Sequence, residues 1–411
     1  MQKKIQNCRI CNSKELVTVL DLGKQKLTGI FPKNREDYLT DGPVELLKCS
    51  NSNGCGLVQI AHQYDLSELY GENYGYRSGL NKSMVLHLEN KVKRIISLVE
   101  LKKDDLVIDI GSNDCTTLKF YSPDLSLVGI DPSGGKFLRY YPEHVKLIED
   151  FFSADILSQE LAKRKAKVIT SFSMFYDLEK PIEFMEEIKM SLDDEGIWIF
   201  EQSYMPFMLE KNSYDTVCQE HIEYYTLKQI KWMCDKVGFK IIDIEFNDIN
   251  GGSFSVTVAK LESSHVEDTE RINKILKEEN DNGLDTEKPW IDFQRRIDTA
   301  KKDLLTFLNK CKEENKTVFG LGASTKGNVL LQYCGISEEH IIAIGEVNSD
   351  KYGCYTPGTL IPIISETEVL NANPDYILVF PWHFKDFFLS NLKLKNMKLV
   401  FPLPNVEIIK C

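Results

Sequence analysis

Apolar positions along residues 84–260 follow two periods. From Met84 to Leu101 they recur every three or four residues among Lys and Glu, which predicts an amphipathic helix. Short apolar runs, separated by polar or helical stretches, then follow at Leu106–Ile110, Leu127–Ile130, Val145–Ile148, Val168–Thr170, Gly196–Phe200, Lys240–Phe246 and Ser253–Ala259. Strands that alternate with helices at this spacing predict an α/β domain with a doubly wound, mostly parallel sheet.

The same alternation restarts in the C-terminal third of the chain. The stretch Leu261–Lys288 is dense in charge and poor in apolar residues, which indicates a domain boundary. An amphipathic helix from Trp290 to about Cys311 precedes three further apolar runs, at Thr317–Leu321, Ile341–Glu346 and Asp375–Phe380. We therefore expect a second, smaller α/β domain.

Residues 1 to about 70 differ from both α/β regions. They are rich in loops and turns and hold the only close cysteine pairs before the first long helix, so we expect a small separate module. A chain of 411 residues is long enough for two or three domains, each with its own core. We place the module at residues 1–75, the first α/β domain at 76–265 and the second at 285–411.

Composition and charge restrict the class of protein. Hydrophobic residues make up 42% of the chain and charged residues 27%, and no apolar run approaches the roughly 20 residues of a membrane helix. The N-terminus lacks the apolar core of a signal peptide, so we expect a cytoplasmic protein with no membrane partner. A net charge of −12 without a concentrated basic face argues against nucleic acid as a partner. Eleven cysteines without an export signal indicate thiols or metal ligands rather than disulfides.

The most specific local pattern lies at the end of the first predicted strand. Asp109 and Gly111 close this strand, and the next strand ends at Asp131. The glycine lets the backbone approach a ligand closely, and an acidic residue at the end of the next strand can bind both hydroxyls of a ribose. A single glycine suits a cofactor without a pyrophosphate, which predicts S-adenosylmethionine. The expected cofactor contacts are Asp109, Gly111, Ser112, Asn113, Asp131, Pro132, Asp150 and Phe151.

Two close cysteine pairs lie in the N-terminal module. Two residues separate Cys8 from Cys11, and five separate Cys49 from Cys55. Four thiolates of this kind suit a closed tetrahedral zinc site, whose role would be structural because no position is left open for a substrate. Reduced, buried cysteines without a metal are the alternative.

Two further motifs carry candidate chemistry. Glu220 and His221, with Tyr224 three residues on, follow the fifth predicted strand, on the side where parallel sheets hold ligands. A His is suited to proton abstraction near neutral pH, although a His beside a Glu is also typical of a surface or packing pair. The turn at 320–328, which contains Lys326, would start a helix. It fits an anion site, the first turn of an NAD-type domain, or a packing turn without a ligand.

In order, and over nearly the full length, the motifs resemble those of sugar C-methyltransferases that act on nucleotide-linked keto-deoxysugars. The matching stretches are Cys8–Cys11 with Leu20–Gly23, Tyr70–Gly79, Asp109–Asp114, Glu201–Tyr204, Glu220–His221, Gly251–Ser253, Lys326–Asn328 and Pro357–Gly358. The resemblance implies a small zinc-binding N-terminal module, a central Rossmann-like class I methyltransferase domain and a second, smaller Rossmann-like α/β domain that contributes to nucleotide-sugar binding.

The resemblance also implies the reaction and the roles of several residues. His221 would remove the proton α to the ketone of a nucleotide-diphosphate-linked sugar, and the resulting enolate carbon would take the methyl group of S-adenosylmethionine. Glu220 would orient His221 or hold the sugar, Tyr76 would stabilise the oxyanion, and the Lys326 turn would bind the diphosphate. The expected substrate contacts are Tyr76, Ser78, Tyr224, Asn250, Lys326 and Asn328. We expect a monomer or a small homo-oligomer.

The chain departs from the family pattern at several positions. On the substrate side Cys218 replaces a tyrosine, Gln219 and Asn250 each replace a histidine, and the loop at 173–177 lacks a histidine. On the cofactor side Cys115 replaces a glycine. These changes favour the same reaction class on a different sugar or a different carbon.

Other functions are left open by the residues themselves. An O-methyltransferase acting on a nucleotide sugar would need only one base, because a hydroxyl is already nucleophilic. An NAD-linked nucleotide-sugar oxidoreductase would use the turn at 320–327, with Glu346 as a candidate ribose ligand. A non-catalytic zinc scaffold would not depend on His221. An RNA methyltransferase is disfavoured by the acidic charge.

Overall fold

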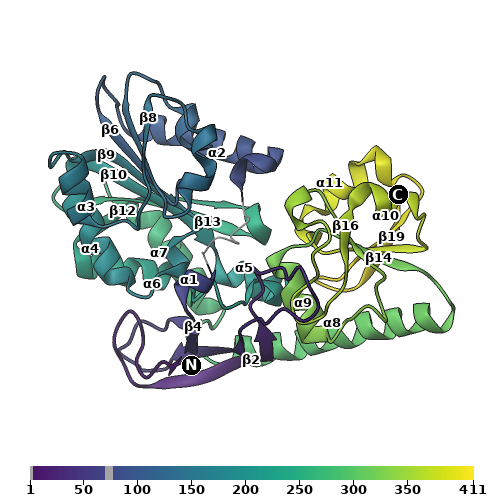
Figure 1. Cartoon of the computed structure of the whole chain (residues 1–411). Helices are drawn as coiled ribbons and strands as arrows, with labels where there is room; N and C mark the ends of the chain where they lie inside the picture. Colours follow the sequence, from purple (N-terminus) through teal and green to yellow (C-terminus); the bar gives the residue numbers. More distant parts are fainter. Residues whose placement is uncertain (1–2, 70–76) are drawn as a thin grey trace.

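The computed structural model describes residues 3–69 and 77–411, and each of its three regions is built on a sheet (Figure 1). We call them the N-terminal module, the central domain and the C-terminal domain. Tyr76, the predicted oxyanion donor, lies outside the described residues.

The N-terminal module is an antiparallel sheet where we expected mainly loops and turns. Its order is β11-β4-β3-β2, with β2 (Leu16–Lys26), β3 (Asp41–Cys49), β4 (Val58–Ile60) and β11 (Glu223–Tyr224). The strands β1 (Lys3–Lys4) and β5 (His62–Gln63) form a separate pair, and the helix α1 (Leu66–Leu69) follows. Because β11 pairs with β4, the segment just after His221 is a strand of this module.

The central domain contains a seven-stranded sheet in the order β12-β13-β10-β9-β6-β7-β8. Its strands are β6 (Leu106–Ile110), β7 (Ser126–Ile130), β8 (Val145–Ile148), β9 (Ala166–Phe172), β10 (Leu192–Ser203), β12 (Phe239–Asn247) and β13 (Ser253–Lys260). All neighbours are parallel except β13, which runs antiparallel to β10 and β12. All seven predicted strands are present, and the predicted α/β class is confirmed.

Helices cover both faces of the central sheet. Val92 and Ile95 of α2 (Lys82–Leu98) pack in one core with Val107 of β6, whereas Ile108 belongs to the core on the opposite face. That opposite face is covered by α4 (Pro181–Ser191) and α6 (Leu227–Val237). Successive residues of a strand point to opposite faces, so a strand buried on both faces is apolar throughout, as this one is apart from Asp109.

The charged stretch 261–288, which we expected to separate two domains, includes the helix α7 (Thr269–Asp281). Ile272 and Ile275 of this helix are buried in the same core as α4 and α6. Glu279 accepts hydrogen bonds from the backbone amides of Leu227 and Lys228 at the start of α6. The central domain therefore extends into the stretch, because a few well-spaced isoleucines suffice to bury one face of an otherwise charged helix.

The C-terminal domain contains a six-stranded sheet in the order β16-β15-β14-β17-β18-β19, parallel except for β19. Its strands are β14 (Val318–Leu321), β15 (Ile344–Glu346), β16 (Ile363–Ser365), β17 (Tyr376–Val379), β18 (Lys398–Phe401) and β19 (Glu407–Lys410). We predicted β14, β15 and β17 from the sequence. The remaining three strands are short and carry no distinctive pattern.

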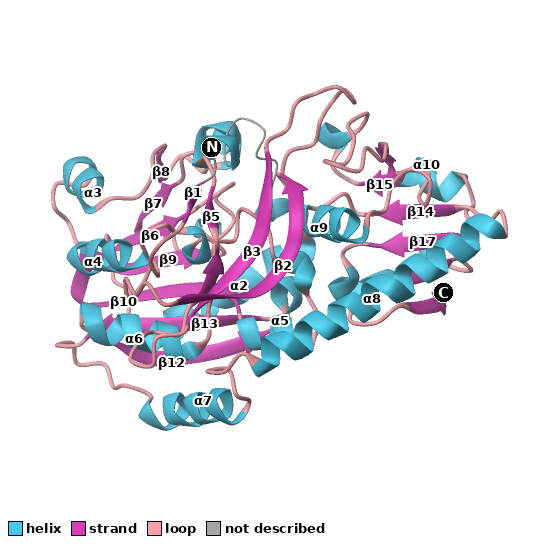
Figure 2. Ribbon diagram, turned by 90° about the horizontal axis from the view of Figure 1, so that it is seen from below, coloured by secondary structure: helices cyan, strands magenta, loops and turns pink. Residues whose placement is uncertain are grey.

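The long helix α8 (Lys288–Glu313) connects the three regions (Figure 2). Its Trp290 and Phe293 share one core with Leu20 of β2, with Met208 of α5 (Met205–Glu210) and with the C-terminal sheet. The other helices are α3 (Ala154–Glu160), α9 (Thr325–Cys334), α10 (Glu366–Asn371) and α11 (Lys385–Ser390). Short 3-10 helices are η1 (Ser78–Leu80), η2 (Leu118–Phe120), η3 (Gly134–Tyr140), η4 (Phe175–Asp177), η5 (Tyr214–Thr216), η6 (Ile249–Gly251), η7 (Ser349–Lys351), η8 (Trp382–Phe384) and η9 (Leu392–Leu394).

Candidate functional site

The predicted cofactor turn begins where β6 ends. Gly111 has a φ of 73°, and its amide donates a hydrogen bond to the carbonyl of Ile130 at 2.8 Å. Asn113 has a φ of 48°, and its amide donates to the carboxylate of Asp131 at 2.8 Å. The turn thus folds back onto the end of β7 and brings together predicted residues from two neighbouring strands.

Asp131 is buried but keeps acceptor capacity. One of its oxygens accepts from the amide of Asn113, and the other accepts from the amide and hydroxyl of Ser133 at 2.8 and 2.7 Å. The carboxylate has about four acceptor sites, so one remains for a ribose hydroxyl. Pro132, Asp150 and Phe151 follow the ends of β7 and β8 and are exposed; Phe151 keeps 57% of its surface. These residues fit a nucleoside that would cover the exposed ring.

Asp109 and Ser112 point into the protein, although we expected both to contact the cofactor. The carboxyl of Asp109 accepts a hydrogen bond from the hydroxyl of Thr170 on β9 at 2.6 Å, and burial raises its pKa to about 7. The hydroxyls of Ser112 and Tyr141 are 2.8 Å apart. Both side chains therefore stabilise the turn from its buried side.

Cys115, which stands where a glycine is usual, keeps the backbone that a glycine would adopt. Its φ is 65° and its side chain is fully buried. The left-handed region costs an ordinary residue roughly 1–2 kcal/mol. The replacement of glycine by Cys115 therefore leaves the backbone conformation of the turn unchanged.

Glu220 and His221 lie in the loop between η5 and β11. The His221 Nδ1 is 2.9 Å from the carbonyl oxygen of Thr216, and its ring packs edge-on against Tyr176 with centroids 4.6 Å apart. The carboxylate of Glu220 accepts a hydrogen bond from the amide of Gly29 in the N-terminal module, and burial raises its pKa. A Cβ added to Gly29 would lie 2.2 Å from Glu220 Oε1, so this contact requires a glycine. Both side chains remain partly exposed, which leaves them reachable by a substrate.

Of the predicted substrate residues, Lys326 and Asn250 are brought together. The Lys326 ammonium donates to the carbonyl of Asn250 at 2.5 Å, and burial lowers the pKa of Lys326. Asn250 has a φ of 55° in the turn before β13. This contact joins the central domain to the first turn of α9.

The other predicted substrate residues have different surroundings. Asn328 is buried and donates to the carbonyl of Thr28 at 2.8 Å, which ties α9 to the N-terminal module. Tyr224 is buried in β11. Ser78 lies on the cofactor side, where its amide donates to the side chain of Asn113 at 3.0 Å. The structure therefore uses Asn328 and Tyr224 for packing.

Packing also accounts for the glycines between the end of β14 and the first turn of α9. A Cβ on Gly320 or Gly327 would lie 2.7 or 3.0 Å from atoms of Phe380, and one on Gly322 would lie 2.5 Å from Pro381. Close approach of the neighbouring chain thus explains each glycine without a dinucleotide. The oxidoreductase hypothesis gains no support from them.

Cys218 and Gln219, two of the departures from the family pattern, are buried. Cys218 lies in the core shared by the three regions. Gln219 donates from its side chain to the carbonyl of Gln25 at 3.2 Å. Both side chains face structural neighbours, so the loop that carries Glu220 is anchored immediately before it.

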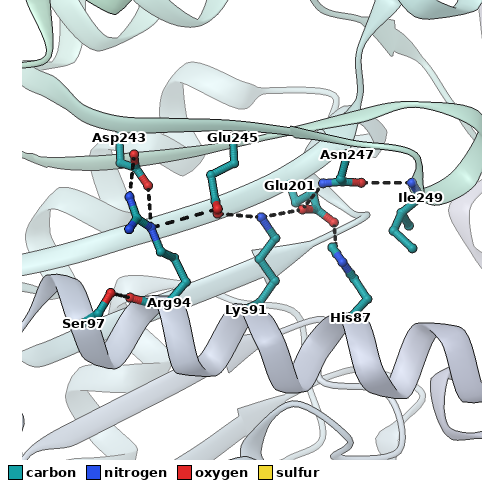
Figure 3. A network of polar contacts seen from close by, with 9 residues as sticks. All are labelled: His87, Lys91, Arg94, Ser97, Glu201, Asp243, Glu245, Asn247 and Ile249. Atoms are coloured by element: carbon teal, nitrogen blue, oxygen red, sulfur yellow. Dashed lines mark hydrogen bonds and ion pairs between the residues drawn. The ribbon is translucent and has the colours of Figure 1, made fainter.

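A polar network lies behind the site, between α2 and the edge of the central sheet (Figure 3). Glu201 at the end of β10 accepts from His87 at 2.5 Å and from Lys91 at 3.0 Å. It also accepts from the side chain of Asn247 at 2.8 Å, which in turn accepts from the amide of Ile249. Burial alone would raise the pKa of Glu201, but these partners outweigh it and lower the pKa. The network thereby fixes the turn that presents Asn250 to Lys326.

Gln202 is a candidate that sequence reasoning missed. It follows Trp198 and Phe200 on one face of β10, and both atoms of its amide are buried without a hydrogen-bond partner among the described residues. Such an amide is rare unless a ligand or water completes it. The Glu201–Tyr204 motif was the available signal.

The four predicted zinc ligands meet in one place. The sulfurs of Cys8, Cys11, Cys49 and Cys55 all lie within 4.8 Å of one another, with 3.4 Å between Cys8 and Cys55 and 3.5 Å between Cys11 and Cys49. Tetrahedral zinc with Zn–S bonds of about 2.3 Å needs sulfurs about 3.8 Å apart. The four thiols fit a closed structural site.

Three family profiles match successive parts of the chain. They are a putative zinc binding domain at residues 8–70, a methyltransferase domain at 84–244 and a C-methyltransferase C-terminal domain at 248–404. The C-methyltransferase NovU of Streptomyces niveus is 26% identical over 415 residues, which cover 99% of this chain and 97% of NovU. The first profile agrees with the four-cysteine cluster, and the predicted zinc site is confirmed.

Two similar solved structures each match less than half of the chain. A chain of the complex between the Haloferax volcanii Trm112 methyltransferase activator and a putative methyltransferase is 12% identical, covers 44% of this chain and 94% of its own, and has a TM-score of 0.36. A putative methyltransferase from Bacillus halodurans is 10% identical over 42% of this chain and 100% of its own, with a TM-score of 0.33. Among the described residues, no helix is long and apolar enough to cross a membrane.

Proposed function

Because the chain belongs to the C-methyltransferase family whose three domains it carries in order, as its motifs predicted, we propose that it methylates a sugar carbon. The methyl group comes from S-adenosylmethionine, and the accepting carbon lies next to the ketone of a nucleotide-diphosphate-linked keto-deoxysugar. When bound, S-adenosylmethionine supplies an electrophilic methyl group. Asp131 and the exposed residues after β7 and β8 would hold its nucleoside.

The contact between His221 and Thr216 is the observation that carries this proposal. A carbonyl oxygen can only accept a hydrogen bond, so Nδ1 of a neutral His221 carries the proton and Nε2 has a free lone pair. This tautomer is the one that a general base needs. A carbon next to a ketone is a poor nucleophile until its proton is removed, and His221 Nε2 would take that proton.

Glu220 and Lys326 would bind different parts of the substrate, the sugar and the diphosphate. Glu220 is held by the amide of Gly29, and its carboxylate would orient His221 or hold the sugar. The partly buried ammonium of Lys326, at the start of α9, would bind the diphosphate. Tyr76 would donate to the developing oxyanion.

Mass spectrometry and NMR with a panel of substrates test the proposal. The protein is incubated in deuterated water with S-adenosylmethionine and nucleotide-linked 4-keto sugars. We expect one sugar to gain a methyl group on carbon, with deuterium entering at that same carbon in unreacted substrate. Methylation on oxygen would instead support the O-methyltransferase alternative, and no methylation of any panel member would contradict the proposal.

A further inference from the structure

Four polar side chains gather where the central domain meets the C-terminal domain. Ser213 and Asp215 lie at η5, Lys326 lies in the first turn of α9, and His383 lies in η8. The helix α9 packs directly against η5, whose Thr216 holds His221. Only Lys326 has a role in the reaction outlined above.

Three of these side chains each hold a buried polar atom that meets no hydrogen-bond partner among the described residues. The atoms are Ser213 Oγ, Asp215 Oδ1 and His383 Nδ1. Ser213 and Asp215 are 2% and 1% exposed. A buried polar atom without a partner costs free energy, so three of them at one junction call for a ligand or water that supplies the partners.

Ser213, His383 and Lys326 lie beside the Asn250–Gly251 turn, and Asp215 is linked to His383 through Trp382. A Cβ added to Gly251 would lie 3.9 Å from Ser213 Oγ and 4.0 Å from His383 Cβ. The second oxygen of Asp215 accepts from the indole of Trp382, the residue before His383, at 2.8 Å. Lys326 donates to Asn250 beside the glycine. Gly251 therefore lies between Ser213 and His383, where a larger side chain would contact both.

The chemistry of the unpartnered atoms selects the kind of group that fits. Burial lowers the pKa of His383 well below its ordinary value, so its ring is neutral. Burial raises the pKa of Asp215, and the charge of Lys326 and the hydrogen bond from Trp382 oppose this rise only in part. A neutral imidazole nitrogen, a hydroxyl and an acceptor oxygen of Asp215 together suit a hydroxyl or amino group, which can donate one hydrogen bond and accept another.

Building on the proposed function, we propose that Ser213, Asp215 and His383 form a subsite for a hydrogen-bond-donating substituent on the sugar of the nucleotide-linked substrate. The substituent is a hydroxyl or amino group, and it lies beside the diphosphate that Lys326 holds. This subsite selects among sugars that differ at one ring carbon.

Calorimetry on the full chain saturated with S-adenosylhomocysteine tests the subsite without turnover. The probes are uridine, thymidine and guanosine diphosphates and their 4-keto-deoxysugar derivatives with a hydroxyl, an amino group or hydrogen at one ring carbon. Asp215→Asn should weaken binding of the donor-bearing sugars about tenfold to hundredfold, because the substituent loses its buried hydrogen-bond partner. Affinity for the free diphosphates and the hydrogen-bearing sugars should change less than about twofold. Whichever of the hydroxyl and amino sugars loses more affinity identifies the substituent.

A second variant and a matched control keep the test decisive. Because Asp215→Asn also alters the contact with Trp382, His383→Phe is measured as well, and it should show the same selective loss of affinity. Asp248→Asn removes a carboxylate that is 97% exposed near the same turn and should change nothing. Variants that bind all probes as the wild type does, or that lose all probes equally, would overturn the subsite but not the proposed function. A wild type that binds S-adenosylhomocysteine but neither nucleotide sugars nor diphosphates would overturn both.

Discussion

The cofactor turn and the loop around His221 differ in where their polar groups find partners. Asp109, Ser112 and Asp131 are hydrogen-bonded to residues of the central domain alone. The Glu220 carboxylate instead depends on Gly29 of the N-terminal module, and Asp215 depends on Trp382 of the C-terminal domain. The proposed cofactor site is thus formed within one domain, whereas the proposed substrate site draws on contacts from all three regions.

This difference implies that distant damage should affect the two sites unequally. Loss of either outer region should abolish chemistry on the substrate and spare cofactor binding. The predictions below test this separation.

Loss of zinc should have the largest effect. Cys49→Ser removes a ligand from a site of the type that contributes about 10–16 kcal/mol to folding, and β4, which follows the site, pairs with β11 next to His221. Turnover should fall below detection, while affinity for S-adenosylhomocysteine stays within about threefold. Zinc content, calorimetry and turnover measure this, and Cys411→Ser, outside the module, serves as control. Normal turnover in a zinc-free variant would contradict the dependence of the substrate site on the N-terminal module.

Removal of the base should lower turnover by about 10²–10⁴-fold. His221→Ala leaves the fold of the cofactor turn untouched, so affinity for S-adenosylhomocysteine should match the wild type. Tyr176→Phe keeps the ring that packs against His221, so its turnover should fall far less than that of His221→Ala. Steady-state kinetics and calorimetry provide the measurements. Equal losses in both variants would point to a packing role for His221.

Asp131→Asn should act on the cofactor side alone. Weaker acceptance from ribose should lower affinity for S-adenosylmethionine by roughly 1.5–3 kcal/mol, which is about tenfold to a hundredfold. Turnover at saturating cofactor should change little, and KM for the sugar should not move. Asp124→Asn, a surface change in the same domain, is the control. Unchanged cofactor affinity in this variant would show that Asp131 does not bind the ribose.

Glu201→Gln should produce the smallest effect, a loss of roughly 1–3 kcal/mol in the free energy of unfolding. The pKa of Glu201 lies below its ordinary value of 4.5, so the ionised carboxylate stabilises the fold above about pH 4.5 and this stabilisation disappears as the pH falls through the folded pKa. The difference from wild type should be constant near neutral pH and shrink in acid. Denaturant unfolding across pH measures it, with surface Glu262→Gln as control. A stability difference between variant and wild type that grows in acid would contradict a stabilising role for the ionised Glu201 carboxylate.

Periodicity predicted the central sheet because its strands are buried on both faces and are therefore apolar throughout. It missed β2 and β3, whose alternating burial mixes apolar residues with Lys, Asp and Glu. It also missed β11, since two residues carry no pattern and their pairing with β4 depends on tertiary contact.

The candidate site divides in the same way. The cofactor turn and the end of the next strand lie within about 20 residues, so spacing alone sufficed to predict Gly111 and Asp131 as cofactor contacts. Asp215 and His383 were not predicted, because Asp215 reaches Trp382, the residue before His383, only through the docking of two domains. Asn328 was assigned to the substrate from its motif, yet its amide binds Thr28, a partner that local sequence does not reveal.

The central claim is that His221 removes a proton from carbon, and solvent exchange tests it most directly. The accepted nucleotide sugar is incubated in deuterated water with S-adenosylhomocysteine in place of the methyl donor, and the carbon next to the ketone is followed by NMR. We predict that the wild type exchanges this proton and that His221→Ala exchanges it at least about 10²-fold more slowly. Equal exchange by the two proteins, or no exchange by the wild type above the uncatalysed rate, would contradict the account.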